Sequence, residues 1–181
     1  MRDGASRRSN ASSCKHESAP FPISSEPRLH FAFHFLSTVV SASSDNDEIE
    51  EGLKFQPRFD AAGLVICVAT DAGSGEVLMV AHMNEEALRK TIVSGEAWYY
   101  SRSRKSLWRK GETSGHVQRV VEMRLDCDQD AIWIRVEQTG AACHTGRHSC
   151  FYRKIEKGEG GARLSFVDAD RQFDPKAVYR K

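Results

Sequence analysis

Residues 63–83, GLVICVATDAGSGEVLMVAHM, decide the fold class of this chain. GLVICVAT at 63–70 and VLMVAHM at 77–83 are apolar runs of strand length. The intervening DAGSGE at 71–76 has the glycine-rich, polar composition of a turn. The two runs therefore predict a β-hairpin, and the change of composition at Phe59 predicts that the ordered domain begins there.

One helix and a second hairpin are predicted after this first hairpin. Asn84 is the expected N-cap, two glutamates follow at the positive end of the helix, and Gly95 predicts its end. AWYYSRS at 97–103 predicts a strand. Apolar and polar residues alternate through 117–125 and again through 132–136, which predicts two more strands. The expected fold class is α+β and β-rich, built from antiparallel hairpins with one or two helices.

The composition is that of an ordinary globular protein, with 181 residues, 40% hydrophobic and 28% charged, and a formal net charge of +1. This composition disfavours the membrane and fibrous classes. Because the chain has no overall charge that attracts nucleic acid, an anionic ligand requires a local basic cluster. Five cysteines, three of them near histidines and aspartates, favour reduced thiols in the cytoplasm over a set of disulfides.

Three segments are predicted along the chain. Residues 1–50 are serine-rich and lack sustained periodicity, which predicts a disordered extension. The apolar stretch within it, residues 29–42, is shorter than the ~20 residues that a membrane helix needs. Residues 55–155 form the predicted patterned domain, and residues 156–181 form a charged tail with a short possible strand, ARLSFV, at 162–167.

Cysteines in the second half of the chain suggest one thiolate site for a metal. They are Cys127 in DCDQD (126–130), Cys143 in CHTG (143–146) and Cys150 in SCF (149–151). Zinc takes tetrahedral sulfur and nitrogen ligands, and a catalytic zinc keeps one position for water, which three cysteines would leave open. The spacing also allows three unrelated buried thiols, or a closed structural zinc completed by His144 or His148.

Three aspartates share the DCDQD motif with the first of these cysteines. They are Asp126, Asp128 and Asp130. If residues 126–130 stay extended, the aspartates project from one face and Cys127 from the other, because strand side chains alternate. Three carboxylates on one face repel one another unless a cation neutralises them, and Mg²⁺ prefers oxygen ligands. The alternative is an acidic, solvated turn, since aspartate is common in turns.

A basic cluster lies in SRSRKSLWRKGETSG at 101–115, and its part from residue 104 onward predicts an exposed loop. Arginines make forked hydrogen bonds to phosphate, glycines expose backbone N–H groups, and an aromatic ring can stack on a base. The candidate substrate-binding residues are Arg102, Arg104, Trp108, Arg109 and Lys110. A solvated basic loop is the alternative interpretation.

Taken in order, VLMVAHMNEEAL, YYSRSRKSLWRKGETSGH, DCDQD and GAACHTGRHSCF closely resemble the phosphoribosyl-AMP cyclohydrolase family, over roughly residues 55–155. The resemblance implies a hydrolase of histidine biosynthesis that acts on 1-(5-phosphoribosyl)-AMP. It would open the adenine ring at the N1–C6 bond and give the imidazole carboxamide intermediate. Two departures are His82, where the family motif has Trp, and Cys67, where a small residue is more usual.

The resemblance also implies the cofactors and the assembly. Zn²⁺ would be bound by Cys127 of one subunit and by Cys143 and Cys150 of the other. The protein would therefore be an obligate homodimer with a shared active site. Mg²⁺ would be bound by the three aspartates of the motif.

His144, beside Cys143, is the candidate catalytic base. Three thiolates cancel much of the positive charge of zinc, so its water is less acidic and a nearby base is needed. The alternative role of His144 is to orient the ligand loop. The competing function is a zinc-stabilised nucleic-acid-binding module that uses the basic loop as a phosphate-tracking surface. A nucleoside deaminase is disfavoured because the chain lacks the HxE and PCxxC motifs of that class.

Overall fold

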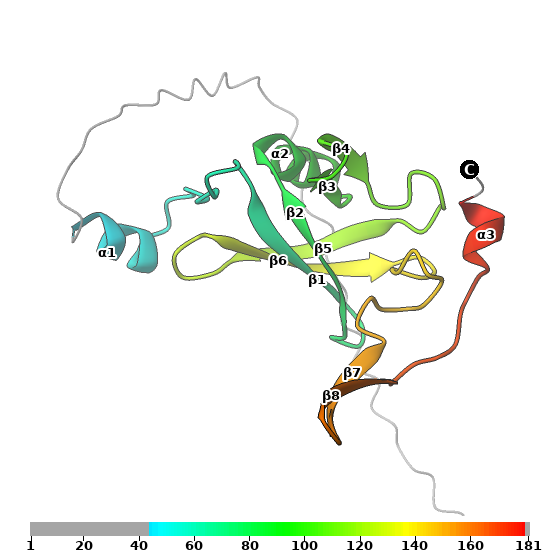
Figure 1. Ribbon diagram of the computed structural model, residues 1–181. Coiled ribbons are helices and arrows are strands. Elements are labelled where there is room, and N and C mark those ends of the chain that lie inside the picture. Colours follow the sequence, from blue (N-terminus) through cyan, green and yellow to red (C-terminus); the bar gives the residue numbers. More distant parts are fainter. Residues whose placement is uncertain (1–43, 180–181) are drawn as a thin grey trace, which may run out of the picture. The chain divides into compact units, whose positions relative to one another are not determined.

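The computed structural model describes residues 44–179, and the hairpin of residues 63–83 lies in the middle of its main sheet (Figure 1). That sheet has six strands in the order β4-β3-β2-β1-β6-β5, and β7 pairs with β8 in a separate two-stranded sheet. The helices are α1 (Ser44–Glu51), α2 (Glu85–Ser94) and α3 (Pro175–Val178). The strands are β1 (Val65–Asp71), β2 (Val77–Met83), β3 (Trp98–Ser101), β4 (Ser106–Arg109), β5 (Gln118–Leu125), β6 (Ala131–Gln138), β7 (Arg153–Gly158) and β8 (Gly161–Phe166).

The two predicted hairpins, β1–β2 and β5–β6, are confirmed, but they join in a way that the sequence did not predict. Val68 of β1 stands opposite Val80 in the antiparallel β2 and opposite Trp133 in β6, which runs parallel to β1. The sheet is therefore mixed, which corrects the expectation of antiparallel hairpins alone. A parallel pair needs a long crossover connection, so its partners are distant in sequence and leave no local pattern.

The core lies on one face of this sheet, as the period-two pattern predicts. Ile132, Ile134 and Val136 of β6 are buried, together with Cys67 and Ala69 of β1. Burial raises the pKa of the Cys67 thiol to about 12, so this thiol stays protonated and unreactive. Cys67, which stands where the family usually has a small residue, therefore contributes to core packing and not to chemistry.

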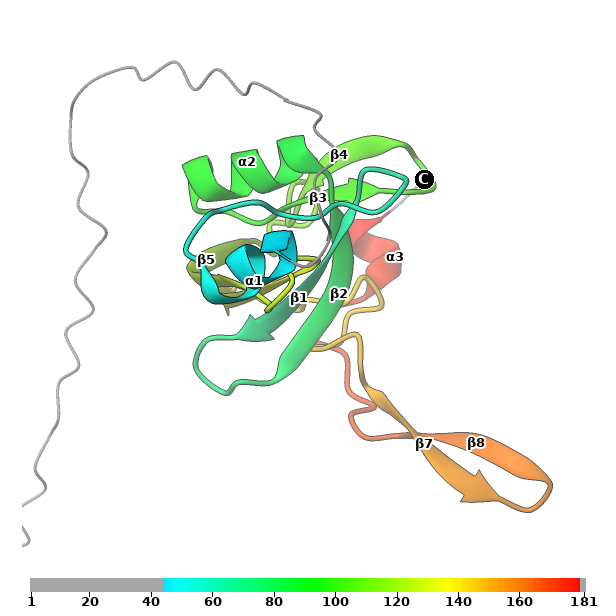
Figure 2. The same cartoon turned by 90° about the vertical axis from the view of Figure 1, so that its left-hand side faces the viewer.

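Helix α2 begins and ends where the sequence predicts. Asn84 Oδ1 accepts a hydrogen bond from the Ala87 amide at 2.9 Å, and Gly95 ends the helix with a left-handed φ of 69°. The helix packs on β2 and β3 (Figure 2). Thr91 on its buried side accepts a hydrogen bond from the Trp98 amide at 3.0 Å, which fixes the start of β3.

The predicted loop at 104–115 is in part a strand. β4 pairs antiparallel with β3 and sets Trp108 opposite Tyr99. Lys105 at the connection has a φ of 50°, a conformation that lets two short strands turn tightly. The many charges in this segment suggested a loop, but they lie on an edge strand, where charged side chains are favoured.

The two ends of the described chain carry elements that sequence reasoning left out. The short strand expected at 162–167 is confirmed as β8, whereas its partner β7 and helix α3 were not expected. At the other end, residues 44–50 of the predicted extension belong to α1. The rest of that extension, with the apolar stretch at 29–42, lies outside the described residues. Within residues 44–179, no helix is long and apolar enough to cross a membrane.

Candidate active site

A cavity of about 680 Å³ joins the basic segment to the predicted zinc loop. Arg104, Trp108, Arg109 and Lys110 line it on one side, and His144 and Cys150 line it on the other. The rest of its lining comes from β2, β4, the loop after β4, Ala142 and the C-terminal segment, namely Met79, Val80, Ala81, Leu107, Gly111, Glu112, Thr113, Ser114, Ala142 and Tyr179. The structure thus brings two motifs together that are some 35 residues apart in the chain.

Arg102 lies in a second cavity, of about 670 Å³, which shares Arg104 and Trp108 with the first. His82 also lines this second cavity. Burial lowers the pKa of His82, and the nearby Arg102 lowers it further. The departure from the family at His82 therefore places a neutral, hydrogen-bonding ring at the edge of the predicted phosphate-binding region.

The loop 142–150 is folded back on itself and tied to the core sheet. The Cys143 amide donates to the Arg147 carbonyl at 3.0 Å, which closes a tight turn around CHTG. The Cys150 amide donates to the Leu78 carbonyl of β2 at 2.8 Å, and Ser149 Oγ donates to Val77 at 2.7 Å. These bonds hold Cys143 near Cys150, which lines the cavity, although the two are seven positions apart in the sequence.

The thiols of Cys143 and Cys150 are neighbours. Although Cys150 as a residue is exposed, its thiol is desolvated at the cavity wall and lies against Cys143, and these effects raise its pKa to about 12. Two adjacent thiols, one of them with a raised pKa, suit a soft divalent ion such as zinc, which binds the thiolate form. A tetrahedral zinc site needs four ligands, and a thiol pair of this kind can supply two of them.

Lys110 lies beside the thiol pair and is buried. Its Nζ donates to the His116 carbonyl at 3.2 Å. Burial lowers the pKa of Lys110, and the nearby Cys150 and Cys143 oppose that shift. The buried ammonium of Lys110 opposes the rise in the pKa of Cys150, so Lys110 acts on the thiol end of the cavity.

Two of the residues predicted to bind the substrate already contact other side chains of the protein. Arg109 forms an ion pair with Glu96 at 2.9 Å, so part of its charge is balanced. The Trp108 ring centroid lies 4.9 Å from that of Tyr99, and Trp108 also lines the cavity, where part of the indole can meet a ligand. Tyr99 is itself fixed by a 2.7 Å hydrogen bond to Gln118 Oε1. His144, the predicted base, is exposed and lines the cavity.

The third predicted zinc ligand, Cys127, is exposed on the turn between β5 and β6. Among residues 44–179, the three aspartates form a potential metal-binding group, with ligand oxygens within 4.8 Å of one another, and no such group includes a cysteine. A single chain therefore brings Cys143 and Cys150 together and leaves Cys127 apart.

The aspartate cluster exists, but the strand geometry expected for it is wrong. β5 ends at Leu125, and residues 126–130 form a turn in which Gln129 has a φ of 59°. This left-handed residue reverses the chain, and the turn rather than strand alternation gathers the aspartates. The Asp128 carboxylate raises the pKa of Asp130, with smaller effects from desolvation and from Asp126. A divalent cation would relieve this repulsion, so the oxygen donors suit Mg²⁺.

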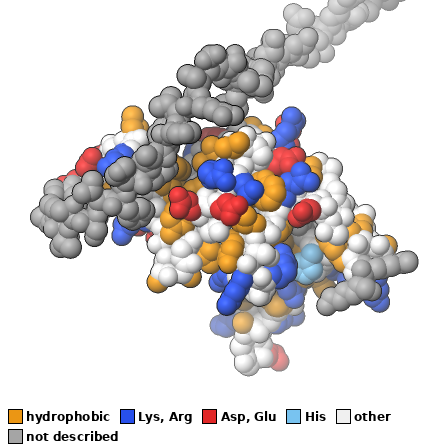
Figure 3. All heavy atoms as spheres, turned by 90° about the horizontal axis from the view of Figure 1, so that it is seen from above, with side chains coloured by type: hydrophobic (Ala, Val, Ile, Leu, Met, Phe, Trp, Pro, Cys, Tyr) orange, Lys and Arg blue, Asp and Glu red, His pale blue; other side chains and the backbone are white. Residues whose placement is uncertain are grey.

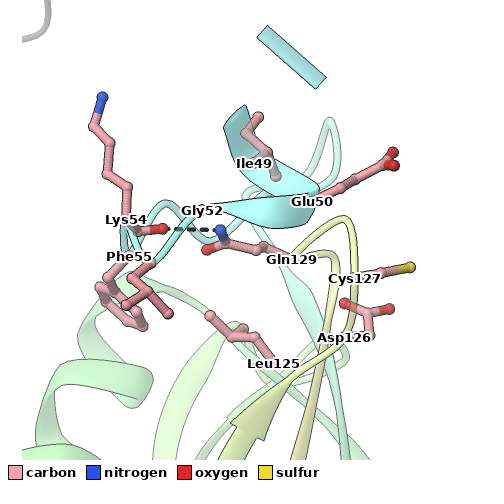
Figure 4. Close-up of a pocket in the computed structure, with 10 residues that line it drawn as sticks. Ile49, Glu50, Gly52, Lys54, Phe55, Leu125, Asp126, Cys127 and Gln129 are labelled. Atoms are coloured by element: carbon pink, nitrogen blue, oxygen red, sulfur yellow. Dashed lines mark hydrogen bonds between the residues drawn. The ribbon is translucent and has the colours of Figure 1, made fainter. Parts of the chain in front are cut away.

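Gln129 holds the aspartate turn, a role that sequence reasoning missed. Its side chain is buried and donates to the Lys54 carbonyl at 2.9 Å (Figure 4). It also accepts from the Gln56 amide at 2.8 Å. Its carbonyl accepts from the Arg58 amide at 2.7 Å. Cys127 points away from Gln129 in the same view. The turn therefore presents Cys127 outward because Gln129 is bound inward.

Replacing Gln129 with Ala should lower the free energy of unfolding by about 1–2 kcal/mol, because two hydrogen bonds to the segment 54–56 are lost. Urea unfolding measures this change. The control is Gln56→Ala, because Gln56 contributes its backbone N–H to the contact and should lose less than about 0.5 kcal/mol. Equal destabilisation by both variants would mean that the Gln129 side chain does not hold the turn.

The cavity combines basic side chains, an indole ring, a histidine and a thiol, a set that suits an enzyme acting on a small phosphorylated molecule with an aromatic ring. The family model for phosphoribosyl-AMP cyclohydrolase matches residues 79–152. The chain is 77% identical over 139 residues to the phosphoribosyl-AMP cyclohydrolase of Bradyrhizobium diazoefficiens, which covers 77% of this chain and 99% of the relative. It is 76% identical over 140 residues to that of Nitrobacter hamburgensis, covering 77% of this chain and 95% of the relative. The chain belongs to the phosphoribosyl-AMP cyclohydrolase family.

This membership confirms the predicted family, whereas the nucleic-acid-binding alternative finds no support in these relatives. The surface in Figure 3 agrees with that outcome. Among the described residues visible there, acidic and basic side chains are interspersed with hydrophobic ones rather than gathered into an extended basic patch of the kind that follows a phosphate backbone.

Proposed function

We propose that this chain hydrolyses phosphoribosyl-AMP in the cavity between β4 and the loop 142–150, with zinc at the thiols and magnesium at the aspartates. The protein is a hydrolase of histidine biosynthesis. In the reaction, the oxygen of water joins C6 of the adenine ring and the N1–C6 bond breaks. C6 keeps its amino group and becomes a carboxamide, while N1 takes up a proton.

The observation that carries this proposal is the convergence of Trp108, Lys110, His144 and Cys150 on one cavity. The indole of Trp108 suits the planar base, and the basic side chains suit the two phosphates. Arg104 lies where the two cavities meet, and Arg102 lies in the second of them. These positions support an arrangement in which each of the two phosphate groups of the substrate would meet a cation.

The proposed base is His144. It is exposed to the cavity and follows Cys143 directly, so it can take a proton from the attacking water and return it to N1. The alternative, in which His144 only orients the ligand loop, predicts that a His144 variant loses zinc affinity rather than turnover at full zinc occupancy.

The proposed zinc site uses Cys143 and Cys150 of one subunit and Cys127 of the other, in a homodimer. This arrangement is supported by the position of Cys127, which faces outward on a turn while the other two thiols are neighbours. When bound, zinc activates water for attack. Because the site needs reduced thiols, we place the enzyme in the cytoplasm.

The proposed magnesium site is the aspartate turn. Mg²⁺ keeps several waters and binds to a few carboxylates plus substrate phosphate, so it would position the nucleotide from the subunit that also donates Cys127. The crowding of the three carboxylates supports this assignment.

Asp128→Asn should raise the Mg²⁺ concentration for half-maximal turnover by about tenfold, because one ligand charge is lost, while the zinc content stays the same. Activity titrations with Mg²⁺ and metal analysis measure the two quantities. Asp170→Asn, at an exposed aspartate outside the turn, is the matched control and should change neither. Loss of zinc in the Asp128 variant would contradict the assignment of separate sites.

The reaction itself is tested by running it in water enriched in heavy oxygen. The label is expected in the carboxamide of the product and nowhere else, because water attacks C6. A product that lacks the label at that position, or that has lost its amino group, would contradict the proposed chemistry.

A further inference from the structure

We infer that the C-terminal segment 171–179 is a wall of the substrate cavity and that the Tyr179 ring packs against the bound nucleotide. This inference rests on the proposed function, since it takes the same cavity as the substrate site. The family model ends at residue 152, so this segment lies beyond it. Tyr179 nevertheless lines the cavity together with Trp108, Lys110 and His144.

The segment is attached to the thiol loop through its backbone. The Gln172 amide donates to the Gly146 carbonyl at 2.7 Å. Gly146 has a φ of 89°, and a Cβ at this position would lie 2.3 Å from the Phe173 carbonyl oxygen. Only glycine allows so close an approach in that conformation. The glycine of CHTG thus lets the C-terminal segment pack directly on the loop that carries Cys143 and His144.

A row of aromatic rings also connects the C-terminal segment to the end of the basic segment. Phe173 meets the His116 ring edge-on at 4.7 Å, and the Tyr179 ring lies 6.1 Å from Phe173 at an angle of 61°. His116 follows the loop after β4, whose residues 111–114 line the cavity. Figure 1 shows α3 beside this loop. The two loops that carry the predicted chemistry are therefore bridged by the C-terminal segment.

Helix α3 determines where Tyr179 lies. Asp174 Oδ1 accepts from the Lys176 amide at 3.0 Å and begins the turn, and the Tyr179 amide donates to the Pro175 carbonyl at 2.8 Å and ends it. Tyr179 is 39% exposed, so one part of its ring is packed and the rest is open to a ligand. With Trp108 already in contact with Tyr99, Tyr179 gives the cavity a second aromatic surface for a planar base.

Tyr179→Ala is expected to raise the KM for phosphoribosyl-AMP about tenfold and to change kcat less than about threefold, since an aromatic contact with a base is lost but the reacting groups remain. Tyr179→Phe should keep KM within about twofold of the unchanged protein, because the ring is retained. Lys176→Ala is the control, since Lys176 is exposed in the same helix and does not line the cavity. An unchanged KM in Tyr179→Ala, or an equal change in the Lys176 variant, would overturn the inference.

Calorimetric titration with AMP, the adenylate half of the substrate, separates this inference from the proposed function. Weaker AMP binding in Tyr179→Ala but not in Tyr179→Phe would support the inferred contact of Tyr179 with the nucleotide. If the unchanged protein then failed to open phosphoribosyl-AMP, that failure would count against the proposed function alone. If the unchanged protein opened the ring but both variants bound AMP with equal affinity, the inferred role of Tyr179 would be overturned and the proposed function would stand.

Discussion

Cys143→Ser is expected to remove bound zinc and to lower ring-opening turnover on the order of 10³-fold or more, because the activated water is lost with the metal. Cys143 is buried beside the Cys150 thiol, and serine binds zinc far more weakly than a thiolate does. Metal analysis of the purified variant and the rate of product formation measure the two losses together.

The control for this variant is Cys67→Ala. Cys67 is a buried thiol of the core sheet with its pKa raised to about 12, so its loss should leave zinc and turnover in place and cost only about 1 kcal/mol of stability. A folded Cys143→Ser protein that lacks zinc and still turns over at the original rate would contradict the zinc mechanism.

Mixing Cys127→Ser with Cys143→Ser chains is expected to restore activity to about a quarter of the original level, although each variant alone is inactive. If each site of a twofold dimer takes Cys127 from one subunit and the thiol pair from the other, random exchange makes about half of the dimers mixed, and each mixed dimer has one intact site of two. Turnover after subunit exchange measures this recovery.

A mixture of Cys143→Ser and Cys150→Ser chains is the matched control for this experiment. Both substitutions fall in the same half of the proposed site, so every site in a mixed dimer lacks one ligand and no activity should return. Recovery of activity in this control would show that the site is not divided as proposed. So would a lack of recovery in the first mixture, once mass spectrometry has verified that the subunits exchanged.

The local elements of the fold could be predicted from the sequence because each has a short-range cause. The β1–β2 and β5–β6 hairpins follow from apolar alternation and turn residues, and α2 follows from its caps at Asn84 and Gly95. The parallel contact of β1 with β6 could not be predicted, since its partners are more than 60 residues apart. The segment that forms β4 was predicted to be a loop because its charged residues outweighed its strand-forming residues.

The candidate site was predictable as residue types but not as geometry. The three aspartates were expected on a strand face, yet Gln129 in a left-handed conformation gathers them on a turn. No local pattern identified Gln129, because its three bonds go to residues 54–58, more than 70 positions earlier. The place of Tyr179 in the cavity likewise depends on the contacts of Gln172 with Gly146 and of Phe173 with His116, which only the folded chain brings together. A motif identifies the chemistry, whereas long-range packing sets the shape of the site.

The central claim is metal-dependent opening of the adenine ring. It is tested most directly by following the conversion of phosphoribosyl-AMP by the purified protein with Zn²⁺ and Mg²⁺, then after chelation, and again after both metals are returned. We expect turnover that is lost on chelation and recovered when the metals are restored. Turnover that survives complete removal of zinc, or no turnover by a folded, zinc-loaded protein, would contradict the claim.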